Sequence, residues 1–307
     1  MAFNFELLHV RGKFAFEEPM SRHCSWRTGG SAERFFEPAD VDDLIAYFQQ
    51  VNEVESITWI GLGSNVLVRD GGVSGTVIST AKTLNNIAWL DHEHLQVECG
   101  TTCAKVAKEA ARMALGGGGF LAGIPGTIGG ALAMNAGAFG RETWMLVESV
   151  ELIRRDGTMN QYDRAEFSPS YRCVDMLPEH WFISAVLHFD SNCPIDGDNE
   201  IRELLAQRSA SQPTGLASCG SVFKNPPNDF AGRLIEQAGL KGMRVGGCYV
   251  SDKHANFIIN DEGASAADIE GLIAEVQMSV VKKFDVRLEP EVKIIGTRGN
   301  MRVSRVK

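Results

Sequence analysis

The backbone is under the strongest constraint at Gly116-Gly117-Gly118-Gly119-Phe120-Leu121-Ala122-Gly123-Ile124-Pro125-Gly126-Thr127-Ile128-Gly129-Gly130, a run that continues to Asn135-Ala136-Gly137-Ala138-Phe139-Gly140. Ten of the 32 glycines of the chain lie in this stretch of 25 residues. Because glycine loses more backbone entropy on ordering than any other residue, such a density costs stability unless the backbone turns with positive φ or approaches another group closely. We therefore expect a cofactor here; the alternative is a set of tight turns in a mixed sheet.

A second glycine-containing loop, Gly61-Leu62-Gly63-Ser64-Asn65, follows the strand-like run Ile57–Ile60. The N–H groups of such loops form concavities that hold phosphate oxygens. One loop of this kind would be read as a turn, but two of them flanked by apolar residues favour a cofactor. Neither matches the P-loop pattern or a strand–GxGxxG–helix with a well-spaced acidic residue. No P-loop or Rossmann domain is expected, and a nicotinamide would bind without a domain of its own.

Length and composition narrow the class of protein. The 307 residues predict two or three domains, and 44% apolar with 22% charged residues is typical of a globular chain. A net charge of −9 argues against binding of nucleic acid or anionic membranes through overall charge. No apolar run approaches the roughly 18 residues of a membrane helix, and the start, Met1–Glu6, lacks a signal peptide, so we expect a cytoplasmic protein.

Seven scattered cysteines without a CxxC pair predict neither a metal site nor a disulfide framework. Helices are expected over residues 41–48 after an Asp40 N-cap, over 102–114, 200–208 and 228–239, and after a capping box at Ser265–Asp268. Strands are expected over residues 57–60, 66–68, 76–78, 95–98, 147–153, 181–189 and 292–296, and a linker over 191–198. The last strand is expected to return to the first unit.

The segment Ala217–Pro226 is polar but framed by apolar residues, and Gly220 allows the backbone to present Ser221. Between residues 213 and 258, five basic residues face three acidic ones, a surplus that suits a diphosphate. The same counts fit a solvated face of mixed charge. By composition, Tyr171-Arg172 resembles a packed surface pair, and Glu289-Pro290-Glu291 an exposed strand edge.

Together these segments resemble the UDP-N-acetylenolpyruvoylglucosamine reductases, the FAD enzymes of bacterial peptidoglycan precursor synthesis. The resemblance extends from Trp26-Arg27-Thr28-Gly29-Gly30 to Gly296, in the family's order and spacing. The motifs that carry it are Gly61–Asn65, Gly123–Gly130 with Asn135-Ala136-Gly137, Gly220–Pro226, Leu240-Lys241-Gly242 and His254-Ala255-Asn256-Phe257.

The resemblance implies an α+β fold of three domains, with a vanillyl-alcohol-oxidase (PCMH)-type FAD-binding fold and a C-terminal substrate domain. The first FAD-binding subdomain would span residues 1–80, with residues 289–307 returning to it. The second would span 81–196, and the substrate domain 197–288. At this length the chain resembles the shorter (type II) subclass, which lacks a substrate-covering insertion. The ligands implied are non-covalent FAD, NADPH and a UDP-sugar, bound to a monomer without metal, nucleic acid or membrane partners.

The resemblance also implies roles for single residues. Arg172 and Glu291 would stabilise negative charge on the substrate, and Ser221 would deliver a proton to its C2. Cys173-Val174 stand where the family has a variable residue followed by serine, so a hydrogen bond from that serine to Arg172 is not expected here. Substrate contacts would come from Tyr171, Lys224 and Asn225. FAD contacts would come from Gly61, Gly63, Ser64, Asn65, Gly123, Ile124, Pro125, Gly126, Thr127, Gly129 and Gly130.

Two other functions are weighed against this one. An oxidase of the same fold would return electrons to oxygen, and covalent flavin attachment through His or Cys at the first loop would favour it. No His lies between Gly61 and Gly75. A non-catalytic sugar-nucleotide sensor would be colourless, whereas a flavoprotein is yellow.

Overall fold

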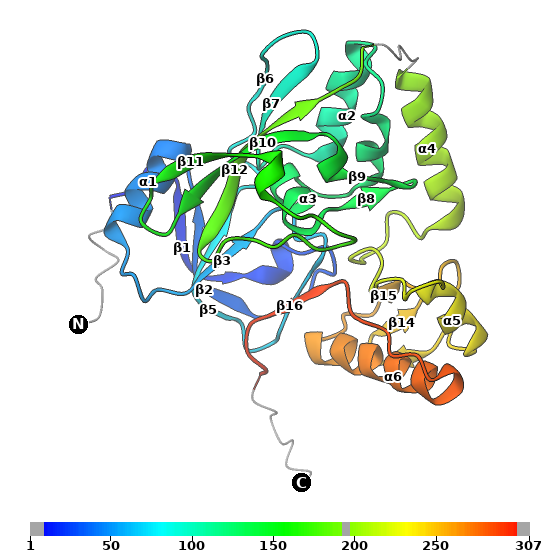
Figure 1. Cartoon of the computed structure of the whole chain (residues 1–307). Helices are drawn as coiled ribbons and strands as arrows, with labels where there is room; N and C mark the ends of the chain where they lie inside the picture. Colours follow the sequence, from blue (N-terminus) through cyan, green and yellow to red (C-terminus); the bar gives the residue numbers. More distant parts are fainter. Residues whose placement is uncertain (1–8, 192–196, 300–307) are drawn as a thin grey trace. The chain divides into compact units, whose positions relative to one another are not determined.

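The computed structural model describes residues 9–191 and 197–299 (Figure 1). Met1–Glu6, most of the predicted linker with Cys193, and the end of the predicted returning segment, 300–307, lie outside the described residues. The chain forms two compact units. Unit 1 comprises residues 1–15, 35–62 and 77–210, and unit 2 comprises residues 16–34, 63–76 and 211–307.

Figure 1 labels most of the helices and strands. The helices are α1 (Val41–Gln50), α2 (Cys103–Arg112), α3 (Ile128–Met134), α4 (Gly197–Ser211), α5 (Ala231–Gln237) and α6 (Ala266–Phe284). The strands are β1 (Lys13–Pro19), β2 (Ser31–Glu37), β3 (Ile57–Ile60), β4 (Val66–Val68), β5 (Val73–Ser79), β6 (Ile87–Trp89), β7 (His94–Glu98), β8 (Gly137–Ala138), β9 (Arg141–Glu142), β10 (Val147–Arg154), β11 (Met159–Asp163), β12 (His180–His188), β13 (Arg244–Val245), β14 (Cys248–Val250), β15 (Ile258–Asn260) and β16 (Lys293–Ile295).

The main sheet of unit 1 has five antiparallel strands in the order β11-β10-β12-β7-β6. Its apolar side chains share one core with α2 and α3, which contribute Val106, Ile128 and Leu132. All three are fully buried. Because α3 lies in the glycine-rich stretch, this core fixes the segment where a cofactor is expected.

A second sheet has the strand order β1-β2-β5-β3. Helix α1 begins at the predicted cap, where the Asp40 side chain accepts from Asp43 N. Its buried face includes Tyr47, whose ring stacks on Phe36 at 4.9 Å between centroids. Apolar residues at helical spacing therefore predicted α1 correctly.

Unit 2 is built around α6 and the antiparallel sheet β13-β14-β15. The predicted capping box is present, since Ser265 and Asp268 each accept from the other's backbone N–H. The apolar stripe that follows is buried from Ile269 to Val280. The predicted terminal strand is β16, which pairs in parallel with β4.

Three sequence expectations need correction. The helix expected from residue 228 begins at Ala231, because Asn228 adopts a left-handed φ of 61° and the Asp229 carboxylate pairs with Arg233. Helix α2 ends at Arg112 rather than at residue 114, where Ala114 turns to a φ of 55°. Helix α3 was not predicted, because its glycines lower helix propensity.

None of the helices in the described residues combines the length and apolarity needed to cross a bilayer. In the same residues, no three or more His, Cys, Asp or Glu side chains are grouped so that they could hold a metal ion.

Candidate functional site

The two glycine-containing segments predicted to bind a cofactor meet in unit 1 at Gly61 and Thr127. A Cβ on Gly61 would lie 2.3 Å from Thr127 Oγ1. Thr127 is the N-cap of α3, and its hydroxyl accepts from Gly130 N at 3.5 Å. Gly61 is therefore required by packing within the protein.

The other predicted glycines differ in what surrounds them. A Cβ on Gly123 would lie 2.5 Å from the Phe139 ring, and one on Gly129 would lie 2.9 Å from the Cβ of Cys99. For Gly130 the nearest atom would be 3.8 Å away, which is ordinary contact, and the residue is exposed. Gly123 and Gly129 are thus explained by the chain itself, whereas no close neighbour in the described residues requires a glycine at position 130.

The loop after β3 exposes main chain. Gly63 has a φ of 62°, and a Cβ there would lie 1.9 Å from His23 O. Within the described part of the chain, the N–H groups of Leu62, Gly63 and Ser64 donate to no protein acceptor. N–H groups without an internal partner are the donors that bind phosphate oxygens. This loop therefore fits a cofactor that carries phosphate and contacts the main chain closely.

The predicted residues Tyr171 and Arg172 lie on a tight turn of unit 1. The turn is closed by hydrogen bonds from Ser170 N to Cys173 O at 2.9 Å and from Cys173 N to Ser170 O at 3.2 Å. The guanidinium of Arg172 lies 5.2 Å from the centroid of the Tyr171 ring. Val174, in the place of the family's serine, is buried in the core of unit 1. The turn therefore presents Arg172 without that serine.

Two backbone carbonyls hold the guanidinium of Arg172. Nη2 donates to Gly137 O at 3.0 Å and Nη1 donates to Asn135 O at 3.4 Å. Arg172 itself has a left-handed φ of 54°. A non-glycine residue in this region persists only where its surroundings hold it, and such residues cluster at functional sites.

In unit 2, Ser221 and Glu291 are brought together by backbone pairing. Glu291 N donates to Val222 O at 2.8 Å, and Lys224 N donates to Glu289 O at 2.9 Å. The side-chain amide of Asn65 donates to Glu291 O at 3.1 Å. The segment that carries Glu291 thus runs alongside the segment that carries Ser221.

Ser221 lines a cavity of about 410 Å³ that lies within unit 2. Burial lowers the pKa of His254 in this cavity, and Lys241 lowers it further. Because His254 Nδ1 accepts from Asn256 N at 3.2 Å, the proton of the neutral ring is assigned to Nε2. The polar residues of the lining are Ser221, Asn225, Arg233, Glu236, Lys253, His254 and Asn256.

This cavity adds functional candidates to those predicted. Arg233 and Lys253 were counted only as part of a charge surplus, and His254 only as part of a motif. Four of the five basic residues in the surplus pair with carboxylates: Lys224 with Glu289, Arg233 with Asp229, Lys241 with Glu236, and Arg244 with Asp261. Much of the surplus therefore forms a face of mixed charge.

The predicted substrate residues Lys224 and Asn225 are both engaged within the protein. Lys224 Nζ donates to Glu289 Oε1 at 2.7 Å, and Asn225 Oδ1 accepts from Ala231 N at 3.0 Å at the start of α5. Asn225 lines the cavity, whereas Lys224 does not. A ligand that binds Lys224 would have to compete with Glu289.

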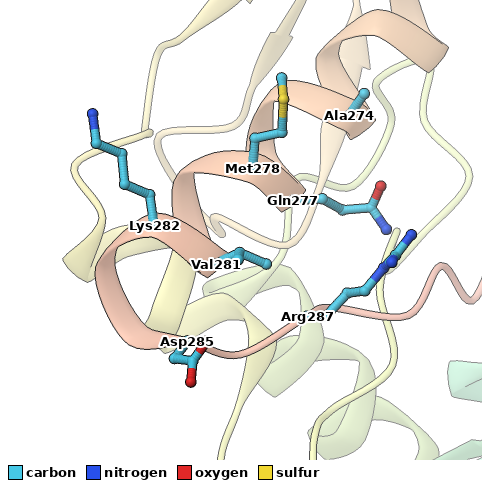
Figure 2. A pocket seen from close by; sticks show the side chains of 7 residues that line it. All are labelled: Ala274, Gln277, Met278, Val281, Lys282, Asp285 and Arg287. Carbon is cyan, nitrogen blue, oxygen red and sulfur yellow. The ribbon is translucent and has the colours of Figure 1, made fainter.

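A larger cavity, of about 530 Å³, lies along α6 and contains none of the predicted residues. Figure 2 shows Met278 and Val281 in this cavity, with the charged side chains of Lys282, Asp285 and Arg287 around them. Its lining is partly apolar and contains no hydroxyl or imidazole group, so it has fewer groups that could take part in proton transfer than the cavity at Ser221.

Cys219, two residues before Ser221, is buried, and burial raises its pKa to about 12. Its Sγ lies 3.4 Å from Val66 O. A thiol with this pKa is not ionised near neutral pH, so Cys219 packs as an apolar residue and is not a nucleophile.

Comparisons with known proteins agree with this geometry. A family model for the UDP-N-acetylenolpyruvoylglucosamine reductase C-terminal domain matches residues 212–295, and one for an FAD binding domain matches residues 32–162. The UDP-N-acetylenolpyruvoylglucosamine reductase of Methylococcus capsulatus is 51% identical over 286 residues, which cover 93% of this chain and 94% of that protein. That of Legionella pneumophila (strain Corby) is 48% identical over 287 residues, 93% of each chain.

A solved structure gives the same result. The UDP-N-acetylenolpyruvylglucosamine reductase (MurB) from Thermus caldophilus aligns with a TM-score of 0.77 at 30% identity, covering 94% of this chain and all of that one. The predicted α+β fold with an FAD-binding part is thereby confirmed. The exposed main chain at Leu62–Ser64 and the open position at Gly130 fit FAD as the phosphate-bearing cofactor. The chain therefore belongs to the UDP-N-acetylenolpyruvoylglucosamine reductase family and is an FAD-dependent oxidoreductase.

Proposed function

We propose that this protein reduces UDP-N-acetylenolpyruvoylglucosamine to UDP-N-acetylmuramate with electrons from NADPH, as a cytoplasmic monomer that serves peptidoglycan precursor synthesis. The observation that carries the proposal is the pairing of residues 222–224 with residues 289–292. It brings a hydroxyl, Ser221, and a carboxylate, Glu291, to neighbouring segments beside a polar cavity. The similarity to named reductases over almost the whole chain supports the substrate.

The loops at Gly61–Asn65 and Gly123–Gly130 would hold FAD, which when bound would carry a hydride from NADPH to C3 of the substrate. No separate nicotinamide domain is required, because NADPH and the UDP-sugar bind one after the other. The overall change adds a hydride at C3 and a proton at C2, so NADPH and one proton are consumed per substrate.

The chain's own residues stabilise the charge that this addition creates. Negative charge develops at C2 and on the neighbouring carboxylate, where a cation and a polarising group lower its energy. Arg172 is the cation and Glu291 the polarising group. The two carbonyls that hold the Arg172 guanidinium fix the direction of its remaining N–H groups.

Ser221 donates the proton to C2. Serine is a weak acid in water, but a carbanion-like centre is a strong base, so a well-placed hydroxyl can protonate it. Gly220, with a φ of 74°, gives the backbone the turn that precedes this hydroxyl. Tyr171, Lys224 and Asn225 bind the substrate, Lys224 by exchanging its partner Glu289 for an anionic group.

The experiment is anaerobic stopped-flow measurement of flavin absorbance on the holoenzyme, first with NADPH and then with the enolpyruvyl substrate. Ser221→Ala should leave reduction by NADPH nearly unchanged and slow reoxidation by the substrate by about 10²- to 10⁴-fold. Ser74→Ala, which removes a hydroxyl from an exposed position of β5 that is not in the cavity, is the matched control and should leave both steps near the wild-type rates.

Other outcomes would contradict the proposal. Equal slowing of both half-reactions by Ser221→Ala would rule out Ser221 as the acid. Faster reoxidation by oxygen than by the substrate would favour an oxidase. A purified protein without flavin absorbance would favour a sugar-nucleotide sensor.

A further inference from the structure

We infer that Asn135 is a positioning residue for Arg172: it holds the turn that carries this arginine and shapes the place of its guanidinium. The inference rests on the role proposed above for Arg172. Asn135 is not predicted to contact the substrate, so it acts through the arginine.

The side chain of Asn135 joins three segments of unit 1. Nδ2 donates to Glu142 Oε2 at 2.7 Å and to Ser170 O at 3.1 Å, and Oδ1 accepts from Trp144 N at 3.2 Å. The residue is 2% exposed. The buried side-chain amide therefore both donates and accepts hydrogen bonds, and losing one of these bonds leaves a buried polar group unsatisfied.

The bond from Asn135 Nδ2 to Ser170 O holds the turn that carries Arg172. Ser170 opens the turn whose two hydrogen bonds with Cys173 enclose Tyr171 and Arg172. The backbone oxygen of Asn135 accepts from Arg172 Nη1 at 3.4 Å. Asn135 thus contacts both the base of the turn and the tip of the arginine.

The neighbouring glycine makes room for the same guanidinium. A Cβ on Gly137 would lie 3.1 Å from Arg172 Nη1 and 2.3 Å from Arg141 O. Gly137 O accepts from Arg172 Nη2 at 3.0 Å. The Asn135-Ala136-Gly137 segment is therefore shaped around the arginine, which itself has the strained φ of 54°.

The residue type at position 135 follows from two requirements. Asn135 caps α3 with a left-handed φ of 45°, which asparagine tolerates better than most residues. Its side chain must also donate to a carboxylate and accept from a backbone N–H. Aspartate would meet the first requirement but would place a carboxylate against Glu142, and glycine would lack the amide.

The test compares Asn135→Asp, which keeps shape and φ, with Asn135→Gly, which keeps φ only. Both should slow reoxidation of the reduced flavin by the substrate by about 10- to 100-fold, because small misplacements of a charge-stabilising group cost rates of this order. Reduction by NADPH should stay within about twofold of wild type. Titration calorimetry of the oxidised holoenzyme with the UDP-sugar should show a raised Kd. Asn160→Asp, at an exposed position of β11, makes the same charge change and should alter none of these quantities.

A double-variant cycle separates positioning from a purely structural role. If Asn135 acts through Arg172, then Asn135→Asp should slow reoxidation no further in an Arg172→Ala background. Additive slowing in that background, equal slowing of both half-reactions, or wild-type behaviour of both Asn135 variants would overturn the inference. If both variants fail to retain FAD, Glu142→Ala removes the acceptor of Asn135 while leaving the cap in place. It should then show the same dependence on Arg172 with about three- to tenfold slowing.

The same cycle distinguishes this inference from the proposed function. If Arg172→Ala alone leaves reoxidation unchanged, the role proposed for Arg172 is wrong. If Arg172→Ala slows reoxidation but the Asn135 variants do not, the proposed function stands and the inference fails.

Discussion

The side-chain amide of Asn256 holds the backbone of Phe223 from both sides: Oδ1 accepts from Phe223 N at 3.0 Å, and Nδ2 donates to Phe223 O at 2.8 Å. The Asn256 backbone oxygen also accepts from Val222 N at 2.9 Å. Residue 223 forms only an isolated bridge, with Pro290, rather than a ladder. One buried side chain therefore replaces part of a sheet in holding the residues next to Ser221.

Replacing Asn256 by Asp should destabilise the protein, because the loss of the Nδ2 donor leaves Phe223 O without its partner in a buried place. The expected loss is about 1–3 kcal/mol in the free energy of unfolding. Urea unfolding of the holoenzyme at saturating FAD measures it. Asn228→Asp, at an exposed residue, should change the value by less than about 0.5 kcal/mol. Similar losses in the two variants would contradict a special role for Asn256.

Gly130→Ala should have opposite effects on the stability of the flavin-free protein and on the affinity for FAD. The methyl group fits the protein, and alanine favours a helix over glycine, so the flavin-free protein should become more stable by up to about 1 kcal/mol. If FAD contacts this backbone, its Kd should rise at least tenfold, as measured by quenching of flavin fluorescence. Gly271→Ala in α6, where the nearest atom would be 3.5 Å away, should stabilise similarly without changing the Kd. An unchanged Kd in Gly130→Ala would remove Gly130 from the cofactor site.

His254 should make the protein less stable in acid. Burial and Lys241 lower its pKa below the ordinary 6.5, although Glu236 and a backbone hydrogen bond oppose the shift. At a pH between the two pKa values, His254 is protonated in the unfolded chain but neutral in the folded one. The contribution of neutral His254 to stability is therefore fully present above about pH 6.5 and is lost as the pH falls below that value. His254→Asn, whose Oδ1 can accept from Asn256 N, should lose less stability between pH 7 and 5 than wild type.

Urea unfolding at each pH measures this difference. His94, whose pKa is raised chiefly by its hydrogen bond to Asp91, has the opposite sign and loses its contribution as the pH rises. Because His94 is present in both proteins, its effect cancels when wild type and His254→Asn are compared. Parallel pH profiles for the two proteins would show that His254 is not the titrating group.

Several elements were predictable from sequence because their signals are local. The Asp40 cap of α1, the Ser265–Asp268 box of α6 and the β-branched strands all depend on residues within one or two turns of each other. The start of α5 was missed for the opposite reason. Its first N–H, that of Ala231, is capped by the side chain of Asn225, and Asn228, where the helix was expected to begin, has a positive φ.

In the site, too, some features depend on neighbouring residues and others on residues far apart in the chain. The chain's order of residues was enough to identify the glycine-rich loops, the Ser221 segment and the family, because the chemistry of each lies in a short run of neighbours. The reason for each glycine could not be read from the order of residues: a Cβ on Gly61 would clash with Thr127, whereas one on Gly130 would make only ordinary contact. The contacts of Asn135 with Ser170 and of Asn256 with Phe223 join residues more than thirty positions apart. Such pairs depend on how the chain crosses itself, since hydrogen-bond energies act over a few ångströms in space whatever the separation along the chain.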